Sequence, residues 1–273
     1  MSLRVEQLAW GHPLPGGDWR QLFRDFSFHC PEGQFVVVIG SNGSGKSTLL
    51  NLVAGTLQAG AGSIRLGDRA LERRRDYARA RWIGRVMQNP LEGSCPGLTV
   101  AENLRLAERR HRPALGWRGL VGLHPNGADR RRYRTLMDDL GVPLAHRLDE
   151  PVGQLSGGQR QTLSLVMATL ASPELLLLDE HTAALDPRAE ATVIALTERL
   201  VRQLGTTTLM VTHSLDQALT YGDRLVMLHE GRLIGDWTSA EREGLTADAL
   251  RGFYGSATMA TTASQSADGP ASS

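Results

Sequence analysis

A glycine-rich segment near the N-terminus constrains this chain more than any other feature. It reads Gly40, Ser41, Asn42, Gly43, Ser44, Gly45, Lys46, Ser47 and Thr48. The apolar run 35–39 precedes it, and a helix-compatible stretch begins at Leu49. In this order of strand, loop and helix, backbone N–H groups and the helix N-terminus bind phosphate. The sequence therefore predicts a nucleoside triphosphate site in which Lys46 supplies positive charge, Ser47 is a ligand of Mg²⁺ and Thr48 packs behind them.

Composition limits the classes of partner. With 273 residues, 41% of them hydrophobic, the chain can form one large or two smaller domains, since a domain takes roughly 100–200 residues. A net charge of +1 gives no overall preference for nucleic acid, so no nucleic-acid partner is expected. Arginine clusters at 73–75 and 130–132 are either solvated faces or local partner sites.

Compartment is indicated by what the sequence lacks. No segment approaches the ~18 apolar residues of a membrane span, and the N-terminus lacks the layout of a signal peptide, so we expect a cytosolic protein. Cys30 and Cys95 have no C-x-x-C spacing, which argues against a disulfide or metal role and fits a reducing compartment.

The hydrophobic pattern predicts an α/β organisation. Short strands are expected at 3–10, 63–66 and 83–87, around the strand at 35–39. A capping box of Thr99 and Glu102 predicts a helix to about residue 110, followed by a loop over 111–127 and a helix over 129–140. Apolar strands at 175–179 and 207–212 flank a helix over 189–204, which is the βαβ pattern of a parallel sheet. A last strand is expected at 224–229, and the small, polar residues of 255–273 predict a disordered tail.

Two adjacent carboxylates end the apolar strand 175–179. Asp179 is expected at the carboxyl edge of the sheet, where it can hold Mg²⁺ through water. Glu180 lies one residue farther out and is the predicted general base for the attacking water. The alternative is that the pair only caps the following turn.

A second phosphate-binding helix start is predicted from four residues. They are Ser156, Gly157, Gly158 and Gln159, and they open a helical run to residue 170. Alone, a serine followed by glycines is an ordinary helix start. Because Gln159 follows and the carboxylate pair lies about twenty residues later, the motif is strong evidence for a specific class of NTPase. With these residues the chain resembles the ATP-binding cassette family, the ATPase subunits of ABC transporters, over roughly residues 3–240.

The resemblance implies a fold and further site residues. The fold is a P-loop NTPase core of the ABC type: a mixed sheet with a RecA-like parallel part and an antiparallel β subdomain, plus an α-helical subdomain inserted at about 89–172, in a nucleotide-binding domain over 1–254. Gln88 would contact Mg²⁺ and the attacking water, His213 the γ-phosphate, and Asp186 the dimer interface. Without a functional role, Gln88 would be a surface amide, His213 a residue at the end of a strand, and Asp186 a helix cap before Pro187.

Adenine contact is predicted less sharply. The family stacks an aromatic residue on adenine from the end of the first strand, and Trp10 fits. Because the stretch 12–20 is long, Trp19 and Phe23 stay alternatives.

The family's mode of action implies partners. Two ATPase copies form a homodimer in which residues 156–159 of one copy clamp the ATP held by Lys46 of the other. Integral-membrane permease subunits, an extracytoplasmic solute-binding protein and a place on the cytoplasmic face of the inner membrane follow. Leu91, Leu98 and Val100 are expected to line the groove for a permease helix, unless they pack inside the helical subdomain.

One position departs from the family, where His181 replaces the proline that usually follows the two carboxylates. This histidine is either a neutral packing residue or a pH sensor.

The chain is also similar to a narrower bacterial group in three segments, at residues 83–88, 179–187 and 221–224. ATPases of that group accompany branched-chain-type permeases and are often assigned to tryptophan or tyrosine uptake. Solute import, possibly of an amino acid, is therefore expected. An exporter or lipid-extraction ATPase and a non-cassette P-loop kinase are the alternatives. A DNA-repair or translation protein would need a second cassette or a coiled coil, which the sequence lacks.

Overall fold

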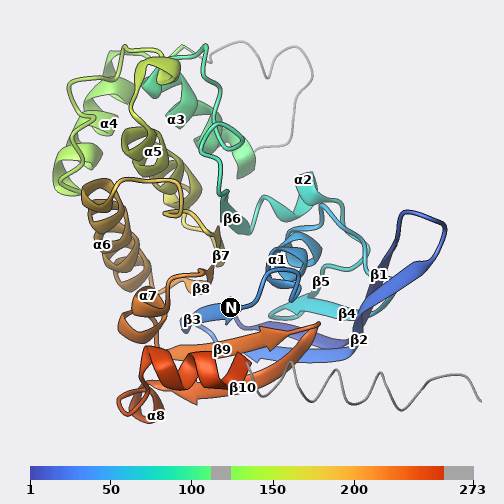
Figure 1. The fold of residues 1–273 in the computed structure, drawn as a ribbon. Coiled ribbons are helices and arrows are strands. Elements are labelled where there is room, and N and C mark those ends of the chain that lie inside the picture. Colours follow the sequence, from blue (N-terminus) through green and yellow to red (C-terminus); the bar gives the residue numbers. More distant parts are fainter. Residues whose placement is uncertain (112–123, 255–273) are drawn as a thin grey trace, which may run out of the picture.

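A computed structural model describes residues 1–111 and 124–254 (Figure 1). The predicted tail at 255–273 and most of the predicted loop at 111–127 lie outside the described residues. The described chain contains two sheets, with helices packed between and around them.

The larger sheet has six strands in the order β10-β9-β3-β8-β7-β6. Their bounds are β3 Phe35–Gly40, β6 Ile83–Val86, β7 Leu175–Asp179, β8 Thr207–Val211, β9 Arg224–His229 and β10 Arg232–Thr238. All neighbours are parallel except β9 and β10. Every residue of β7 and β8 is buried, as their apolar runs predict. The expectation that β9 is the last strand is wrong, because β10 follows it in a hairpin whose partly exposed residues form no apolar run.

The smaller sheet is antiparallel, in the order β2-β1-β4-β5. Its strands are β1 Leu3–Pro13, β2 Trp19–Cys30, β4 Ala61–Leu66 and β5 Arg69–Ala70. One hydrophobic cluster joins this sheet to helix α1, Lys46–Ala54, and to the face of β3 that carries Val36 and Val38. The opposite face of β3, with Phe35, Val37 and Ile39, packs into a second cluster toward the remaining helices. The strand that ends in the phosphate loop is therefore covered on both sides.

A group of helices forms a separate lobe between β6 and β7 (Figure 1). It contains α3 Val100–Glu108, the short 3-10 helix η1 Arg109–His111, α4 Gly127–Asp139, η3 Val152–Gln154 and α5 Gly157–Thr169. Outside this lobe lie α2 Asp76–Arg79, α6 Pro187–Leu204, α7 Leu215–Thr220 and α8 Ser239–Arg242, and residues 247–254 are also helical. The mixed sheet, the antiparallel sheet and the helices confirm the predicted fold class.

Local sequence explains where this lobe begins. The Thr99 hydroxyl accepts the Glu102 N–H at 3.2 Å, and the Glu102 carboxylate accepts the Thr99 N–H at 2.9 Å, which is the predicted capping box. Val100 is fully buried in the core cluster. The prediction that Val100 lines an open groove is therefore wrong, since this first-turn residue packs inward instead.

Two further findings concern the helices and the cysteines. Among the described helices, none combines the length and the apolar character that crossing a bilayer requires. Both cysteines are free thiols, Cys30 buried and Cys95 exposed. Burial raises the pKa of Cys30 to about 12, so this thiol packs as an apolar group.

Candidate functional site

The phosphate loop owes its shape to glycines. Gly43 has φ 77° and Gly45 φ 105°, a region that side chains disfavour. A Cβ on Gly45 would also lie 2.8 Å from the Phe23 ring, which is buried beneath the loop. Phe23 therefore supports the loop from below, and the alternative that it stacks on adenine is wrong because its ring is buried.

The loop closes around its own lysine. Lys46 Nζ donates to the carbonyl oxygens of Gly40 at 2.8 Å and Ser41 at 3.1 Å. Burial lowers the pKa of Lys46, and the carboxylates of Glu180 and Asp179 oppose that shift. The ammonium is thus held at the centre of the loop, with two carboxylates in its field.

Sheet order brings the loop to the first carboxylate. Since β8 lies between β3 and β7 and all three are parallel, the loop after β3 and Asp179 at the end of β7 share one edge of the sheet. Across that edge Ser47 Oγ donates to Asp179 Oδ1 at 2.9 Å. The predicted pair of Mg²⁺ ligands is therefore in direct contact.

An arginine not singled out from the sequence completes this edge. Arg85 on β6 lies with Nη2 3.5 Å from Asp179 Oδ2, and the same nitrogen donates to Asn51 Oδ1 of α1 at 2.7 Å. Burial lowers the pKa of Arg85, and Asp179 opposes the shift. A charged residue inside a short apolar strand was the available signal, but the sequence does not show which carboxylate it faces.

Glu180 begins a constrained turn. It has φ 46°, rare for a residue with a side chain, and its N–H donates to Val211 O at 3.0 Å. His213 Nδ1 lies 3.6 Å from Glu180 Oε2. Both residues follow neighbouring parallel strands, β7 and β8, so the sheet places the predicted base beside the predicted γ-phosphate contact.

A buried glutamine ties the two turns together. Gln217 Oε1 accepts from Thr212 Oγ1 at 2.8 Å, and Gln217 Nε2 donates to Thr182 Oγ1 at 2.9 Å and to Glu190 Oε1 at 2.6 Å. The segment before His213 is thereby fixed to the turn after Glu180. Sequence inspection gave no role to Gln217.

His181 is a packing residue in this structure. Its side chain is 2% exposed, and Nε2 lies 2.9 Å from Thr197 Oγ1 on α6. Because the Thr197 hydroxyl donates to Val193 O at 2.8 Å, Nε2 of His181 carries the proton and donates to Thr197. Burial lowers the pKa of His181 to about 4, which favours the neutral alternative over the pH sensor.

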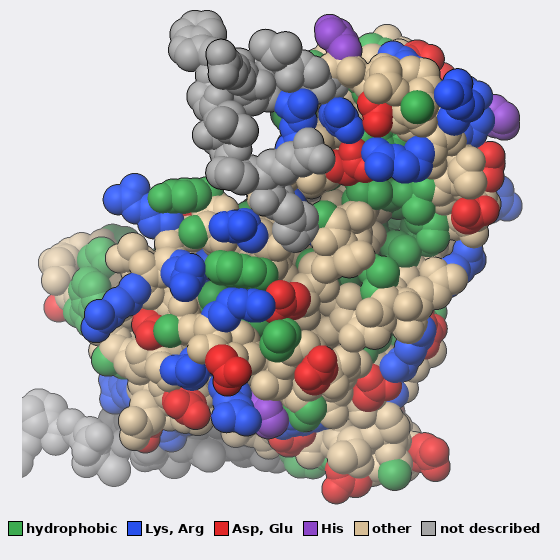
Figure 2. All heavy atoms as spheres, turned by 180° about the vertical axis from the view of Figure 1, so that it is seen from behind, with side chains coloured by type: hydrophobic (Ala, Val, Ile, Leu, Met, Phe, Trp, Pro, Cys, Tyr) green, Lys and Arg blue, Asp and Glu red, His purple; other side chains and the backbone are tan. Residues whose placement is uncertain are grey.

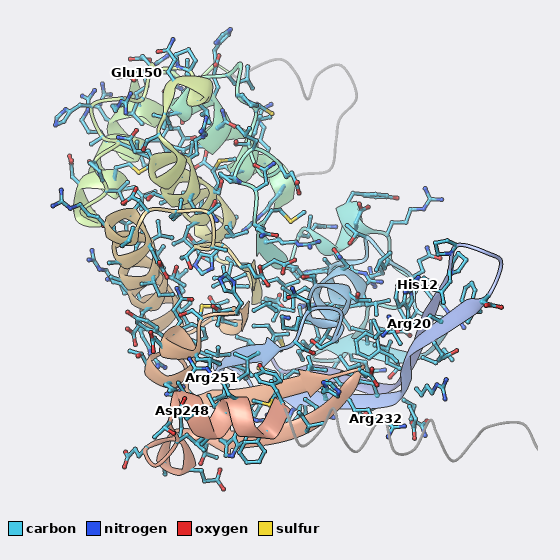
Figure 3. The ribbon with its side chains drawn as sticks, viewed as in Figure 1. His12, Arg20, Glu150, Arg232, Asp248 and Arg251 are labelled. Carbon is cyan, nitrogen blue, oxygen red and sulfur yellow. The ribbon has the colours of Figure 1, made fainter. Side chains whose placement is uncertain are left out.

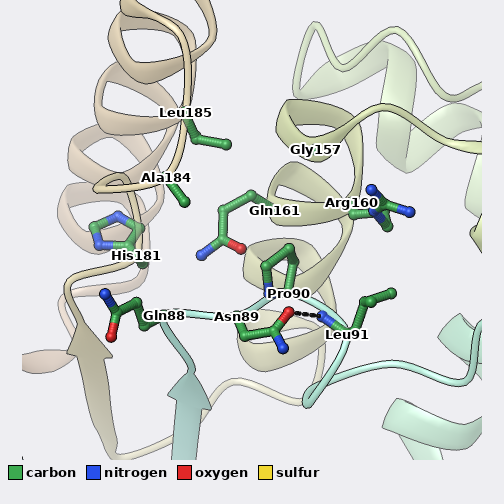
Figure 4. A pocket seen from close by; sticks show the side chains of 10 residues that line it. All are labelled: Gln88, Asn89, Pro90, Leu91, Gly157, Arg160, Gln161, His181, Ala184 and Leu185. Carbon is green, nitrogen blue, oxygen red and sulfur yellow. Dashed lines mark hydrogen bonds between the residues drawn. The ribbon is translucent and has the colours of Figure 1, made fainter.

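A cavity of about 200 Å³ lies between the segment after β6, helix α5 and the turn after β7 (Figure 4). Its lining includes Gln88 and Leu91 after β6, Gln161 on α5, and His181. Gln161 is 1% exposed, and its Nε2 donates to Met87 O at 3.2 Å. Leu91 is 42% exposed. The segment that follows β6 thus contacts α5 and faces the turn after β7 across the cavity.

The second helix start is formed as predicted but lies in the helical lobe (Figure 1). The Ser156 hydroxyl accepts the Gln159 N–H at 3.3 Å, and Gln159 Oε1 accepts the Ser156 N–H at 3.0 Å. Gln159 Oε1 also accepts from Arg147 at 2.6 Å. These contacts stay within the lobe, so the described structure does not bring residues 156–159 to the phosphate loop of the same chain. Asp186 is exposed and caps α6 through the N–H groups of residues 188 and 189.

The adenine candidates occupy different places. Trp10 is partly buried on β1, beside Phe23 of β2, with its ring 5.7 Å from that of His12. Trp19 is 64% exposed at the start of β2, opposite Pro13. Trp10 is therefore closer in the sheet to the residue under the phosphate loop.

The residues present fit a nucleotide with a divalent ion. Ser44 Oγ is buried without a hydrogen-bond partner in the described structure, and a Cβ on Gly40 would lie 2.5 Å from it. The loop is thus both tight and polar. Oxygen donors from Ser47, Asp179 and Gln88 suit Mg²⁺, which uses one or two carboxylates together with phosphate and water. Among the described residues, no group of three or more His, Cys, Asp or Glu side chains is arranged to hold a metal ion.

Comparison with known proteins gives concordant matches. A family model described as "ABC transporter" matches residues 23–183. The tyrosine transport ATP-binding protein of Clostridioides difficile is 43% identical over 91% of this chain and 96% of its own length. The iron(3+)-hydroxamate import ATP-binding protein FhuC of Bacillus subtilis is 32% identical over 93% and 87% of the two chains. The aliphatic sulfonates import ATP-binding protein SsuB of Pseudomonas entomophila is 35% identical over 85% and 79%.

Solved structures agree on the fold. The dimeric structure of MJ0796, a bacterial ABC transporter cassette, aligns with a TM-score of 0.72 at 24% identity, over 87% of this chain and 98% of that chain. The ADP conformation of MJ1267, an ATP-binding cassette of an ABC transporter, aligns with the same TM-score of 0.72 at 24% identity, over 93% and 98%. At this identity the likeness concerns the fold.

Proposed function

The chain belongs to the ABC transporter family and is an ATPase, and from that premise we propose that it is the ATP-hydrolysing subunit of a bacterial importer, which closes as a dimer around ATP. The import direction is supported by the names of relatives that import hydroxamate and sulfonates. The same proposal includes integral-membrane permease subunits as partners, to which an extracytoplasmic solute-binding protein delivers the solute. It also places the chain on the cytoplasmic face of the membrane.

One observation carries the proposal. The phosphate loop, the two carboxylates and His213 meet at one sheet edge, whereas Ser156 and Gln159 present a second helix N-terminus in another lobe. A helix N-terminus favours negative charge. Two copies arranged head to tail give each of these helix ends a phosphate from the partner copy, and ATP then joins the two protomers.

The residues divide the chemistry among them. Lys46 and the loop N–H groups would hold the phosphates, and Ser47, Asp179 and Gln88 would hold Mg²⁺, which would supply positive charge to neutralise the phosphates. Glu180 accepts the proton of the attacking water, and His213, 3.6 Å away, orients toward the γ-phosphate. Asp186 faces the dimer interface, and Trp10 supports adenine. The ordering of these groups by the sheet provides the positioning on which phosphoryl transfer depends.

Complementation between two inactive variants tests the composite site. In a Glu180→Gln background, Lys46→Ala removes the loop's charge and Ser156→Arg places a bulky cation at the helix start. Neither homodimer should retain ATP. A mixture should form heterodimers with one intact composite site, because the intact loop of one copy faces the intact helix start of the other. We expect up to one ATP per heterodimer after gel filtration. If the mixture retains no ATP although heterodimers form, residues 156–159 do not act in trans.

We also propose that the solute is an amino acid, in particular an aromatic one. The relative that shares 43% identity over 91% of this chain is named for tyrosine transport, whereas relatives named for other solutes share lower identity. Uptake of labelled tyrosine and tryptophan in cells that lack this chain tests the solute. A deletion that abolishes sulfonate uptake and leaves aromatic amino acid uptake intact would contradict it without affecting the ATPase assignment.

A further inference from the structure

Arginine side chains gather around two aromatic residues on the surface over and beside α2. This α2 arginine surface consists of Arg73, Arg74, Arg75 and Arg81, with Tyr77 and Trp82. All four arginines are exposed, and Tyr77 is 72% exposed. Figure 2 shows basic side chains surrounding apolar ones on this face of the molecule. The surface shares no residue with the sheet edge that carries the phosphate loop, Asp179 and Glu180.

Guanidinium groups also surround the Trp82 ring. The Cζ atoms of Arg69 and Arg74 lie 5.2 Å from its centroid, and that of Arg81 lies 5.9 Å away. Arg69 is neutralised by Glu174. Across the described ranges, by contrast, none of the four arginines of the α2 arginine surface forms an ion pair. The charges of these exposed arginines are therefore not neutralised by acidic side chains of the described residues.

Acidic neighbours are present, but within the described residues they form no ion pair with these four arginines. Glu72 Oε2 accepts the N–H of Ile64 at 3.3 Å, and Asp76 Oδ1 accepts the N–H of Tyr77 at 2.7 Å. Asp68 is the remaining acidic residue of the segment, and its carbonyl oxygen accepts from Arg65. One N–H bond leaves a carboxylate with further acceptor sites, so the distinguishing feature is that, within the described residues, none of these three carboxylates forms an ion pair with an arginine of this surface.

The second arginine cluster provides the contrast. Arg130 pairs with Asp149, and Arg132 pairs with Glu108 and Asp129. Those charges are used to hold α4 against its neighbours. The two clusters look alike in the sequence, but in the described structure two of the three arginines at 130–132 are paired with carboxylates and none of those at 73–75 is.

We propose that the α2 arginine surface binds the anionic headgroups of a lipid bilayer. Closely spaced arginines are attracted to an anionic membrane surface, and tyrosine and tryptophan are preferred at the level of the headgroups. A fluid bilayer needs no fixed complementary shape, which suits long side chains on a short exposed segment. The net charge of +1 means that the attraction is local to this surface rather than a property of the whole chain.

Vesicle binding by the purified full-length chain tests the proposal. Vesicles of phosphatidylcholine alone are compared with vesicles containing phosphatidylglycerol, by co-sedimentation at low and at physiological salt. The test variant carries Arg73→Gln, Arg75→Gln and Arg81→Gln. The control variant carries Arg20→Gln, Arg24→Gln and Arg232→Gln, which removes the same charge; Arg20 and Arg232 lie on β2 and β10, away from α2 (Figure 3).

We expect the wild type to bind only the anionic vesicles, with affinity that falls as salt rises. Each arginine near such a surface contributes about fivefold, so the test variant should bind roughly a hundredfold more weakly, while the control variant keeps most of the affinity. Both variants should retain ATP hydrolysis, since none of the six residues is in the site. Equal loss in both variants would reduce the effect to net charge and overturn the proposal. So would tighter, surface-dependent binding to a labelled oligonucleotide, or loss of permease association in the test variant without loss of vesicle binding.

Discussion

Replacing Arg79 should destabilise the helix that carries the phosphate loop's lysine. Arg79 ends α2 and is 1% exposed. Its Nη1 donates to the carbonyl oxygens of Leu52 at 2.6 Å and Val53 at 2.8 Å, in the last turn of α1, and its Nε donates to Arg74 O at 2.8 Å. The last carbonyls of a helix have no partner within the helix, so this guanidinium satisfies them.

The magnitude follows from these contacts. A hydrogen bond from a charged donor contributes about 1.5–3 kcal/mol, and a buried carbonyl left without a donor costs about 1–3 kcal/mol. Burial lowers the pKa of Arg79, which reflects the cost of removing its charge from water and reduces the net gain. We therefore expect Arg79→Met to lower the free energy of unfolding by about 3–5 kcal/mol, rather than the sum of three full bonds. For a domain of this size that corresponds to a fall in Tm of roughly 10 °C.

Urea denaturation followed by circular dichroism gives the required free energies. Arg79→Lys keeps the charge but has a single donor head, so it should recover only part of the stability. Arg75→Met removes an exposed neighbour on the same segment and should change the free energy by less than about 0.5 kcal/mol. A loss below 1 kcal/mol in Arg79→Met, or an equal loss in Arg75→Met, would refute the argument from buried carbonyls.

Four further predictions address the site. Glu180→Gln should slow hydrolysis by at least ~10² and trap an ATP-bound dimer in size-exclusion chromatography, whereas a monomer with normal turnover would remove Glu180 as the base. Arg85→Met should lower the free energy of unfolding by about 2 kcal/mol and change the Mg²⁺ dependence of ATP binding; an unchanged Mg²⁺ titration would limit this residue to a structural role. Leu91→Glu should spare the ATPase of the isolated chain and uncouple transport in the assembled complex, and a collapse of its Tm would favour internal packing. Folding lowers the pKa of His181 from an ordinary 6.5 to about 4, so between these pH values the unfolded chain binds a proton that the folded chain does not. The contribution of His181 to the free energy of unfolding is therefore complete above pH 6.5 and declines by about 3 kcal/mol as pH falls to 4. His181→Gln should remove this decline when urea denaturation is measured across that range.

Sequence patterns predicted the buried strands and helix starts because each has a local cause. The strands β7 and β8 are continuous apolar runs, and the helix starts at Thr99 and Ser156 carry their own capping residues. The strand β10 was missed because it is an edge strand with partly exposed residues, so neither an apolar run nor a clean alternation marks it. Val100 was misplaced because a first-turn position does not indicate which face of the helix packs.

Contacts between distant segments could be predicted from the sequence only where the order of parallel strands implies them. Ser47 and Asp179 were expected near each other because both follow parallel strands, and they are in contact. The partners of Arg85 and Gln217 depend on which strand and turn lie beside them, which no local pattern records. The roles assigned to the site residues stay predictions, since geometry places the groups without showing their reaction.

The structure links the proposed base to the proposed dimer contact through one helix. His181 directly follows Glu180 and donates to Thr197, in the interior of α6, while Asp186 caps the start of the same helix. The turn between β7 and α6 is therefore held at both ends by α6, so a displacement of the helix start moves the backbone that carries Glu180. Where proline would stiffen this turn through its own ring, His181 fixes it through a buried hydrogen bond to another element. In the proposed dimer, closure at Asp186 would then position the proposed base in the same movement and would couple hydrolysis to the presence of the second protomer.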